Sequence, residues 1–569
     1  MDDPNDQQLR AVVAGDGPVL IIAGPGTGKT KTLTARIAHL VENGGTKPGH
    51  ILALTFTNKA AEEMRIRLKG LMPGKLPDVC TFHALCHNIL DNTTDFVSDA
   101  ARLSMIKSLT KPASLKAYST RELGLIISRA KNDVRIDDPE LSKLVRAYNR
   151  ALAAQKLRDF DDLLVQTYQL LSQDETRRSE LTQHYTHILV DEFQDTNNLQ
   201  YEILRLLASH NNLFVIGDPN QSIYGFRGAS GTIFERFTAD YPDHLAITLT
   251  INYRSTASVV RLSNAIFPDN ADLVAHSQAA GMARAVEVLN EYSEAQWVLH
   301  EIQQAIGGGD FLRAVSDDSR LTHRRLSDFA VLYRSRSAAA TFQKLLAESG
   351  LPYQVVGDGS PYDQPSIQAI ITLLRAAITS QPIEMEGYTS AERRLLEEEL
   401  AKGRESAPGA LVERIVQLLG LDTDGAIQQL LSVLTRFTDI PSALAYIDQI
   451  AEHGFYDPAA DAITLLTIHA AKGLEFAQVF LIGVEEGILP SARGEEAEER
   501  RLFYVAVTRA RERLDIVHAR NRGGQTAHPS RFITTLSLEE LPHLIDPDME
   551  NQARRIAKRA AKNSQQSLF

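Results

Sequence analysis

Two kinds of apolar pattern alternate along this chain. Short runs of β-branched and other apolar residues precede polar or glycine-rich turns, as in "VLIIA" at residues 19–23 and "FAVLY" at residues 329–333. Such runs are typical of strands buried in a parallel sheet. Elsewhere apolar residues recur every three or four positions, as in "LRDFDDLLVQTYQLL" at residues 157–171, which predicts amphipathic helices. The pattern predicts an α/β protein.

Composition narrows the class of protein. The chain has 569 residues, 43% hydrophobic and 23% charged, which predicts a globular protein of several domains. No apolar run approaches the roughly 18 residues of a membrane span, so no membrane partner is expected. The spacing of Cys80 and Cys86 argues against a disulfide framework or metal cluster and favours a cytoplasmic location. The net charge of -12 carries little weight, because local grooves decide whether a polyanion binds.

A glycine-rich turn follows the first apolar run. In "VLIIAGPGTGKTKTLTARIAHL", residues 19–40, a strand pattern meets this turn and then a helical pattern, which is the context of a phosphate-binding loop. Ala23 stands where the motif usually begins with glycine. The backbone N–H groups of the later glycines, the lysine charge and a hydroxyl for Mg²⁺ suit a nucleotide. These candidates are Gly24, Gly26, Gly28, Lys29 and Thr30.

Paired carboxylates follow a second strand pattern. In "HILVDEFQDTN", residues 187–197, Asp191 and Glu192 come directly after the apolar run. Asp191 can hold Mg²⁺ through water, and Glu192 can deprotonate the attacking water. Alone, the pair is equally compatible with a solvated strand end. Together with the phosphate loop it predicts hydrolysis of a nucleoside triphosphate.

A third segment suggests what the hydrolysis drives. In "VIGDPNQSIYGFRGA", residues 215–229, Gln221 follows a strand pattern and Tyr224, Phe226 and Arg227 cluster beyond it. Aromatic rings beside an arginine on a loop offer surfaces on which nucleic-acid bases stack. Core packing is the alternative, and the adjacent Gly225 and Gly228 favour an exposed loop instead.

Together these motifs resemble those of superfamily 1 DNA helicases of the UvrD/Rep/PcrA type. The segments "AGPGTGKT", "LTFTNKAAEEM", "TFHAL", "VDEFQDTN", "GDPNQSIYGFRGA", "NYRST", "TIHAAKGLEF" and "RLFYVAVTRA" occur in the family's order, and the resemblance covers roughly residues 4–535. It implies ATP and Mg²⁺ as cofactors. Gln8 would read the adenine edge, Tyr253 would stack on the adenine face, and Glu475 would approach the ribose.

The resemblance also implies how hydrolysis is coupled to motion. Arg254 and Arg509 would reach the γ-phosphate from the second core domain, while Gln221 senses it from the first. Such arginines stabilise the transferred phosphoryl group only when the cleft closes. The alternative for either arginine is an exposed salt bridge.

For single-stranded DNA, the resemblance implies stacking on Phe56, Tyr224 and Phe226. The position of Phe226 is often Trp in the family, so stacking is expected to be weaker there. His83 could equally be a buried histidine with no DNA contact. Residues implied near phosphates or between the two sites are Thr81, His83, Arg227, Thr467 and His469.

The implied fold class is α/β, with two RecA-like parallel-sheet cores that each carry a mainly helical insertion. The second insertion is shorter than the family leads us to expect, which bears on processive unwinding more than on translocation. The expected segments are residues 1–88 and 189–246 for the first core, 89–188 for its insertion, 247–375 and 460–540 for the second core, 376–459 for the reduced second insertion, and 541–569 for a flexible basic tail.

Three functions remain open at this point. The first is an ATP-dependent 3′ to 5′ translocase and helicase on single-stranded DNA and its junctions with duplex, acting in repair or replication. The second is a translocase that strips protein from single strands with little unwinding. The third is an adaptor switched by ATP that hardly turns over, against which Lys29, Glu192 and Arg509 argue.

The chain ends in "QQSLF" after a basic stretch. This pentapeptide resembles those with which bacterial replication and repair proteins enter the hydrophobic pocket of the sliding clamp. Gln565 would offer amide hydrogen bonds, while Leu568 and Phe569 would bury apolar surface. Docking on the protein's own surface, or an incidental frayed end, is the alternative.

Overall fold

The computed structural model describes residues 4–547 apart from short gaps. The gaps are residues 91–94, 111–112, 133–134, 209–211, 226–227, 230, 270–271, 280, 308–323, 358–361, 363, 380–389, 404–405, 422–424 and 452–455. The chain divides into two compact units, of residues 1–279 with 500–504 and of residues 280–499 with 505–569. Each unit is described by itself. Within the described residues, no helix is both long and apolar enough to cross a membrane.

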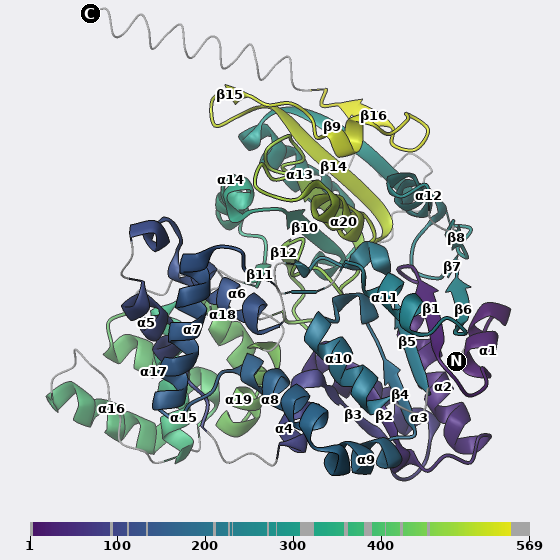
Figure 1. The fold of residues 1–569 in the computed structure, drawn as a ribbon. Coiled ribbons are helices and arrows are strands. Elements are labelled where there is room, and N and C mark those ends of the chain that lie inside the picture. Colours follow the sequence, from purple (N-terminus) through teal and green to yellow (C-terminus); the bar gives the residue numbers. More distant parts are fainter. Residues whose placement is uncertain are drawn as a thin grey trace, which may run out of the picture. The chain divides into compact units, whose positions relative to one another are not determined.

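A six-stranded sheet forms the centre of the first unit (Figure 1). Its order is β3-β2-β4-β5-β1-β6, and every neighbouring pair is parallel. Because the carboxyl ends of parallel strands share one edge, the turns that follow β1, β2, β4 and β5 lie together. The strands are β1 (Val19–Ala23), β2 (Ile51–Thr55), β3 (Asp78–Thr81), β4 (His187–Val190), β5 (Leu213–Gly217) and β6 (Leu245–Leu249).

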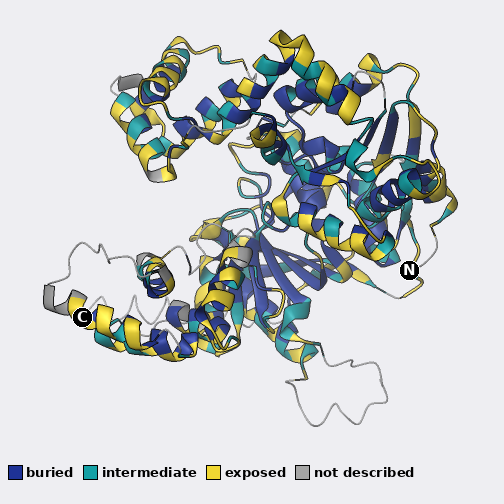
Figure 2. Cartoon of the chain, turned by 90° about the horizontal axis from the view of Figure 1, so that it is seen from below, coloured by how far each residue is buried: buried dark blue, intermediate teal, exposed yellow. Residues whose placement is uncertain are grey.

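Helices cover both faces of this sheet. Alternate side chains of a strand point to opposite faces, so Leu52 and Leu54 enter one core while Ile51 and Ala53 enter the other. Both faces are therefore apolar, and Figure 2 shows the strands as buried. The helices on one face are α1 (Asp6–Val12), α2 (Lys29–Glu42) and α3 (Asn58–Leu71), and those on the other are α4 (Phe82–Ile89), α8 (Phe160–Gln173), α10 (Asn198–Leu207) and α11 (Ile233–Asp240).

The helical insertion of the first unit has a core of its own. Ile106, Leu123, Leu144 and Tyr148 are among the residues packed inside it. Two helices, α8 and α9 (Glu175–His184), lead back to the sheet. The other helices are α5 (Asp99–Leu109), α6 (Thr120–Lys131) and α7 (Pro139–Ala154).

A buried lysine joins these helices. The Lys131 ammonium lies 2.9 Å from Asp159 and 2.7 Å from Asp162, with only 4% of its side chain exposed. Asp159 is also the N-cap of α8, and it accepts a hydrogen bond from the Tyr148 hydroxyl at 3.0 Å. Removing one partner of such a buried pair costs roughly 3–5 kcal/mol, because a charge is left uncompensated. The lysine therefore holds the ends of α6 and α8 in a defined arrangement.

The second unit is built on an eight-stranded sheet. Its order is β11-β12-β10-β13-β14-β9-β16, all parallel, and β15 (Gln525–Thr526) adds antiparallel to β14. The strands are β9 (Met282–Asn290), β10 (Phe329–Tyr333), β11 (Tyr353–Val356), β12 (Ile463–Thr467), β13 (Phe476–Ile482), β14 (Ala510–Arg522) and β16 (His543–Ile545). The helices of this unit include α13 (Glu291–Ala305), α14 (Arg336–Ser349) and α21 (Arg531–Thr534), and both ends of α20 (Glu496–Val507), whose residues 500–504 group with the first unit.

A second helical insertion interrupts this sheet. It has a separate apolar core that includes Ile370, Leu411 and Leu430. Two parallel sheets flanked by helices, with mainly helical insertions, confirm the expected α/β class. The helices are α15 (Pro365–Thr379), α16 (Ser390–Gly403), α17 (Pro408–Leu418), α18 (Gly425–Leu434) and α19 (Ile440–Ala451).

Several expected boundaries fall inside single elements: residues 188 and 189 both belong to β4, and residues 375 and 376 both belong to α15. The boundary at residue 247 falls inside β6, which pairs with β1, and residues up to 279 group with the first unit. There the chain forms β7 (Ile251–Asn252), α12 (Ala257–Ile266) and β8 (Val274–Ala275). The tail expected from residue 541 includes β16, because Leu541 is fully buried and β16 pairs with β9. Residues 548–569 lie outside the described residues.

Candidate functional site

The glycine-rich turn joins β1 to the start of α2. Gly26 and Gly28 have φ values of 70° and 83°, which favour glycine. A Cβ on Gly26 would lie 2.6 Å from the Cβ of Arg254, and one on Gly28 would lie 2.8 Å from Nε2 of Gln8. Both the backbone conformation and the available space therefore require glycine at these positions.

Lys29 opens α2 and folds back over the turn. Its Nζ donates to the carbonyl oxygens of Ala23 at 3.1 Å and Gly24 at 3.2 Å, and Thr27 Oγ1 donates to Gly24 at 2.8 Å. The first N–H groups of a helix lack partners within the helix and attract anions. The turn thus presents backbone donors and an ammonium group from one short segment, as phosphate binding requires.

The paired carboxylates lie beside this turn. Asp191 follows β4, and its Oδ2 accepts a hydrogen bond from Thr30 Oγ1 at 3.2 Å. Burial, and secondarily the neighbouring Glu192 carboxylate, raise the pKa of Asp191 to about 7. Glu192 has a φ of 52°, which is uncommon for a residue with a side chain and is a form of strain found at functional sites. Thr30 and Asp191 thus place a hydroxyl oxygen and a carboxylate oxygen side by side.

Gln194 links the carboxylates to the next loop, a role not expected from the sequence. Its Nε2 donates to Glu192 Oε2, and its Oε1 accepts from the backbone N–H of Asp218 at 2.9 Å. Asp218 Oδ2 in turn accepts from Gln221 Nε2 at 2.7 Å. Gln194, Asp218 and Gln221 are all buried. A hydrogen-bonded chain therefore runs from Glu192 to Gln221.

The residues expected at the adenine also lie near the turn. Gln8 is buried, and its Nε2 donates to the carbonyl of Thr27 at 2.9 Å. Tyr253 is exposed, its backbone N–H donates to Gly26 at 2.8 Å, and its hydroxyl accepts from Asn5 at 2.9 Å. An exposed ring fastened to the phosphate turn is suitably held for stacking on a base.

Arg254 groups with the first unit in the structure, although it follows residue 247, where the second core was expected to begin. Asn252 fixes this segment: its Nδ2 donates to the carbonyl of Pro25 at 2.8 Å, and its Oδ1 accepts from the backbone N–H of Arg254 at 2.9 Å. These bonds hold Arg254 beside the turn. The sequence motif alone did not reveal which unit would carry it.

Four expected site residues lie in the second unit: Arg509 and Glu475, expected at the nucleotide, and Thr467 and His469, expected near DNA phosphates or between the two sites. Arg509 is almost fully buried, and its guanidinium donates to the carbonyls of Val505 at 2.9 Å and Leu474 at 3.1 Å. Glu475 is exposed just before β13. Thr467 and His469 are half-buried at the end of β12 and in the turn after it. Glu475 and Arg509 directly precede the neighbouring amino ends of β13 and β14, whereas Thr467 and His469 lie at the opposite, carboxyl edge of the sheet.

A cavity of about 570 Å³ opens between the sheet and the helical insertion of the first unit. Phe56 and Tyr224 stack there with centroids 5.1 Å apart and planes inclined by 17°. Thr81 and His83 line the same cavity, and burial lowers the pKa of His83. Four residues expected at DNA are thus brought together, whereas Phe226 and Arg227 lie outside the described residues.

Other residues of the cavity were missed from the sequence. Phe160 lies at its wall with 63% of its surface exposed, stacked on Phe96 and edge-on to His83. Asn132 and Asn197 line it as well. The available signal for Phe160 in the sequence was an aromatic residue surrounded by charged residues in the segment "RDFDD". Nothing local marks the two asparagines.

Two family models match the chain. The UvrD/REP helicase N-terminal domain matches residues 4–138 and 115–242, and the UvrD-like helicase C-terminal domain matches residues 247–385 and 422–521. The chain belongs to the UvrD/REP helicase family. It is 31% identical to the ATP-dependent DNA helicase PcrA of Bacillus subtilis and 32% identical to the ATP-dependent DNA helicase UvrD1 of Mycobacterium tuberculosis, over 95% of this chain and 86% of each relative. The resemblance expected from the motifs is confirmed.

Proposed function

We propose that this UvrD-type protein hydrolyses ATP to move 3′ to 5′ along single-stranded DNA and to unwind DNA at junctions during repair or replication. An ATP-dependent DNA helicase is the activity that membership of the family supports. The direction of movement, the pathway and the residue roles are parts of the proposal. We also expect the protein to act in the cytoplasm.

One observation carries the proposal. The Lys29 turn, Thr30 and the Asp191–Glu192 pair meet at the carboxyl edge of one parallel sheet, with 3.2 Å between Thr30 Oγ1 and Asp191 Oδ2. In our assignment Lys29 and the turn bind the phosphates, Gln8 and Tyr253 hold the adenine, and Glu192 accepts the proton of the attacking water.

The residues fit a magnesium ion. Mg²⁺ prefers oxygen ligands, and the Thr30 hydroxyl and the Asp191 carboxylate offer them side by side. The raised pKa of Asp191 reflects a buried carboxylate that a cation would stabilise in its charged form. Thr30 and Asp191 would hold the ion, which would supply positive charge to the phosphates.

The negative charge that develops on the transferred phosphoryl group needs further hydrogen-bond donors to stabilise it. We assign Arg254 of the first unit, together with Arg509 of the second unit, to the γ-phosphate. Gln221 would sense the same group and pass its state to Glu192 through Asp218 and Gln194. Glu475 would contact the ribose.

The aromatic cavity is our proposed path for single-stranded DNA. Phe56, Tyr224 and the exposed Phe160 offer ring faces, while the carboxylates of Asp99 and Asp161 line the same cavity. Carboxylates repel phosphates, so the bases rather than the backbone are expected to enter. Further proposed contacts are Thr81, His83, Phe226, Arg227, Thr467 and His469.

Replacing both stacked rings tests this path. We expect the Phe56→Ala, Tyr224→Ala double variant to bind oligo(dT) more weakly, because stacking contributes about 1–3 kcal/mol per base, or roughly 5- to 150-fold in Kd. Tyr118→Ala, which removes an exposed tyrosine of the helical insertion, is the matched control. Fluorescence anisotropy of labelled oligo(dT) measures the Kd of the double variant and of the control. Equal affinity of the double variant and the parent protein would exclude stacking on this pair.

The function itself is tested by two assays on the purified protein. A motor should hydrolyse ATP much faster with single-stranded DNA than without it, whereas an ATP-switched adaptor should not. Strand displacement on duplexes with a 3′ or a 5′ tail then measures direction and unwinding. Stimulated hydrolysis with no displacement from either tail would favour the protein-stripping translocase.

We also propose that the terminal "QQSLF" binds a bacterial sliding clamp. Gln565, Leu568 and Phe569 lie outside the described residues, so this proposal rests on the sequence. Such an anchor would raise the effective concentration of the motor near DNA. Titration of the clamp with the parent protein should give binding, which a variant lacking Leu568 and Phe569 should lose. Equal binding by both, or binding by neither, contradicts the proposal.

A further inference from the structure

One side chain of the helical insertion contacts the segment that follows the paired carboxylates. Asn132 is the C-cap of α6, and its Oδ1 accepts a hydrogen bond from Nδ2 of Asn197 at 2.9 Å. Asn197 comes shortly after Glu192 and is the N-cap of α10. Both asparagines are buried, with 3% and 7% of their surfaces exposed. The bond joins the insertion to the loop that carries the proposed catalytic base.

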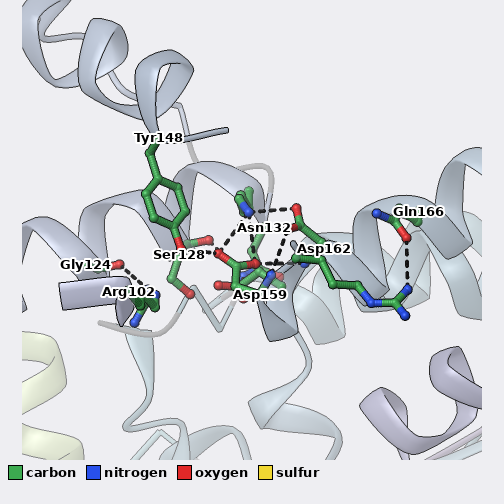
Figure 3. A network of polar contacts seen from close by, with 11 residues as sticks. Arg102, Gly124, Ser128, Asn132, Tyr148, Asp159, Asp162 and Gln166 are labelled. Carbon is green, nitrogen blue, oxygen red and sulfur yellow. Dashed lines mark hydrogen bonds and ion pairs between the residues drawn. The ribbon is translucent and has the colours of Figure 1, made fainter. Parts of the chain in front are cut away.

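Asn132 itself is held firmly. Its Nδ2 donates to the carbonyl of Ser128 at 2.9 Å and to Asp161 Oδ1 at 2.8 Å. The preceding residue, Lys131, is fixed by Asp159 and Asp162. Figure 3 shows Asn132 within this network, with the Tyr148 hydroxyl directed at Asp159. A displacement of the ends of α6 or α8 would therefore move Asn132.

Asn197 connects two loops of the first unit. Its backbone forms an isolated antiparallel bridge with Ala229, and Ala229 N–H donates to the carbonyl of Tyr224 at 3.2 Å. Its side chain caps α10 by accepting from the N–H of Gln200 at 2.8 Å. Three segments thus meet at Asn197: the loop that carries Tyr224, the loop that carries Asp191 and Glu192, and the helical insertion.

The same asparagines line the cavity of Phe56 and Tyr224. We propose that Asn132 is a positioning residue through which DNA in this cavity stimulates ATP hydrolysis, by setting Asn197 and with it the Glu192 loop. The inference rests on the proposed assignment of DNA to the cavity. The insertion forms one wall of the cavity, and the loop of residues 191–197 forms another. A DNA strand bound between these walls would therefore change the distance between them. The Asn132–Asn197 bond would carry this displacement to the Glu192 loop.

The test is the ratio of the ATPase kcat at saturating oligo(dT) to the kcat without DNA. We expect Asn132→Ala to lower this ratio about three- to tenfold, the size expected for one buried hydrogen bond. Saturating DNA removes any contribution of weakened DNA binding. Tyr148→Phe is the matched control, because it removes a hydrogen bond from the same network but leaves the Asn132–Asn197 bond. It should lower the melting temperature while keeping the ratio.

Asn197→Ala removes the same bond from the other side and serves if Asn132→Ala does not fold. If the pair acts as a unit, the double variant should have the ratio of the more impaired single variant. A parent-like ratio in Asn132→Ala, multiplied losses in the double variant, or an equal loss in Tyr148→Phe would each overturn the inference. A parent protein without DNA stimulation would instead contradict the proposed function.

Discussion

Lys29→Ala is expected to reduce ATP hydrolysis roughly 10²- to 10³-fold or more, with and without DNA. The Lys29 ammonium is held over the glycine-rich turn by the carbonyls of Ala23 and Gly24, where the proposed phosphates bind. Removing a donor that stabilises charge in the transition state has an effect of this size. Phosphate release under steady-state conditions measures it directly.

The control for this variant is Lys31→Ala. Lys31 lies in the first turn of the same helix and carries the same charge, but it lies beyond the motif residues that face the proposed phosphates. Lys31 is half-buried, and its replacement is expected to change kcat by less than about threefold, since substitutions away from the groups that bind the phosphates have small effects. If both variants lost hydrolysis to the same extent, the rate would depend on positive charge near the start of α2 and not on Lys29 in particular.

Glu192→Gln is expected to reduce kcat roughly 10²- to 10⁴-fold while ATP binding is retained, the range typical for loss of a general base. The amide keeps the size of the side chain, and its oxygen can still accept the hydrogen bond from Gln194. Glutamine at a φ of 52° carries a backbone cost similar to that of glutamate. The substitution therefore isolates the loss of basicity from changes in structure.

Binding of a fluorescent ATP analogue and single-turnover hydrolysis separate the two effects. Glu235→Gln, on the exposed side of α11, is the matched control and should retain the parent kcat. Hydrolysis by Glu192→Gln at the parent rate would show that Glu192 is not the base. A parallel loss of ATP affinity would instead indicate that the substitution disturbs the phosphate turn.

Local sequence was sufficient to predict several parts of the fold and site. The strand, glycine-rich turn and helix around Lys29 were predicted, as was the strand before Asp191, because each requires a contiguous pattern of apolar and small residues. Phe56, Thr81, His83 and Tyr224 were expected at one DNA surface, and the structure brings them to one cavity. Their roles there remain predictions.

Other features depended on contacts between distant segments. The predicted boundary at residue 247 fell within a strand because β6 completes the first sheet beside β1. β16 extends into the expected tail because its pairing partner, β9, lies far away in the sequence. A short apolar segment such as "HLI" has no strand signal of its own until a neighbouring strand supplies hydrogen bonds.

The sequence by itself determined the motifs: a glycine-rich turn, paired carboxylates and aromatic residues in the order of the UvrD/REP helicases. Only the tertiary structure decided that Arg254 belongs to the first unit, that Gln194 bridges Glu192 and Asp218, and that Asn132 meets Asn197 across 65 residues of sequence. The physical reason is that a motif's chemistry depends on neighbouring residue types, whereas a side-chain hydrogen bond depends on distance and direction between helices and loops. Those are set by the packing of the whole unit.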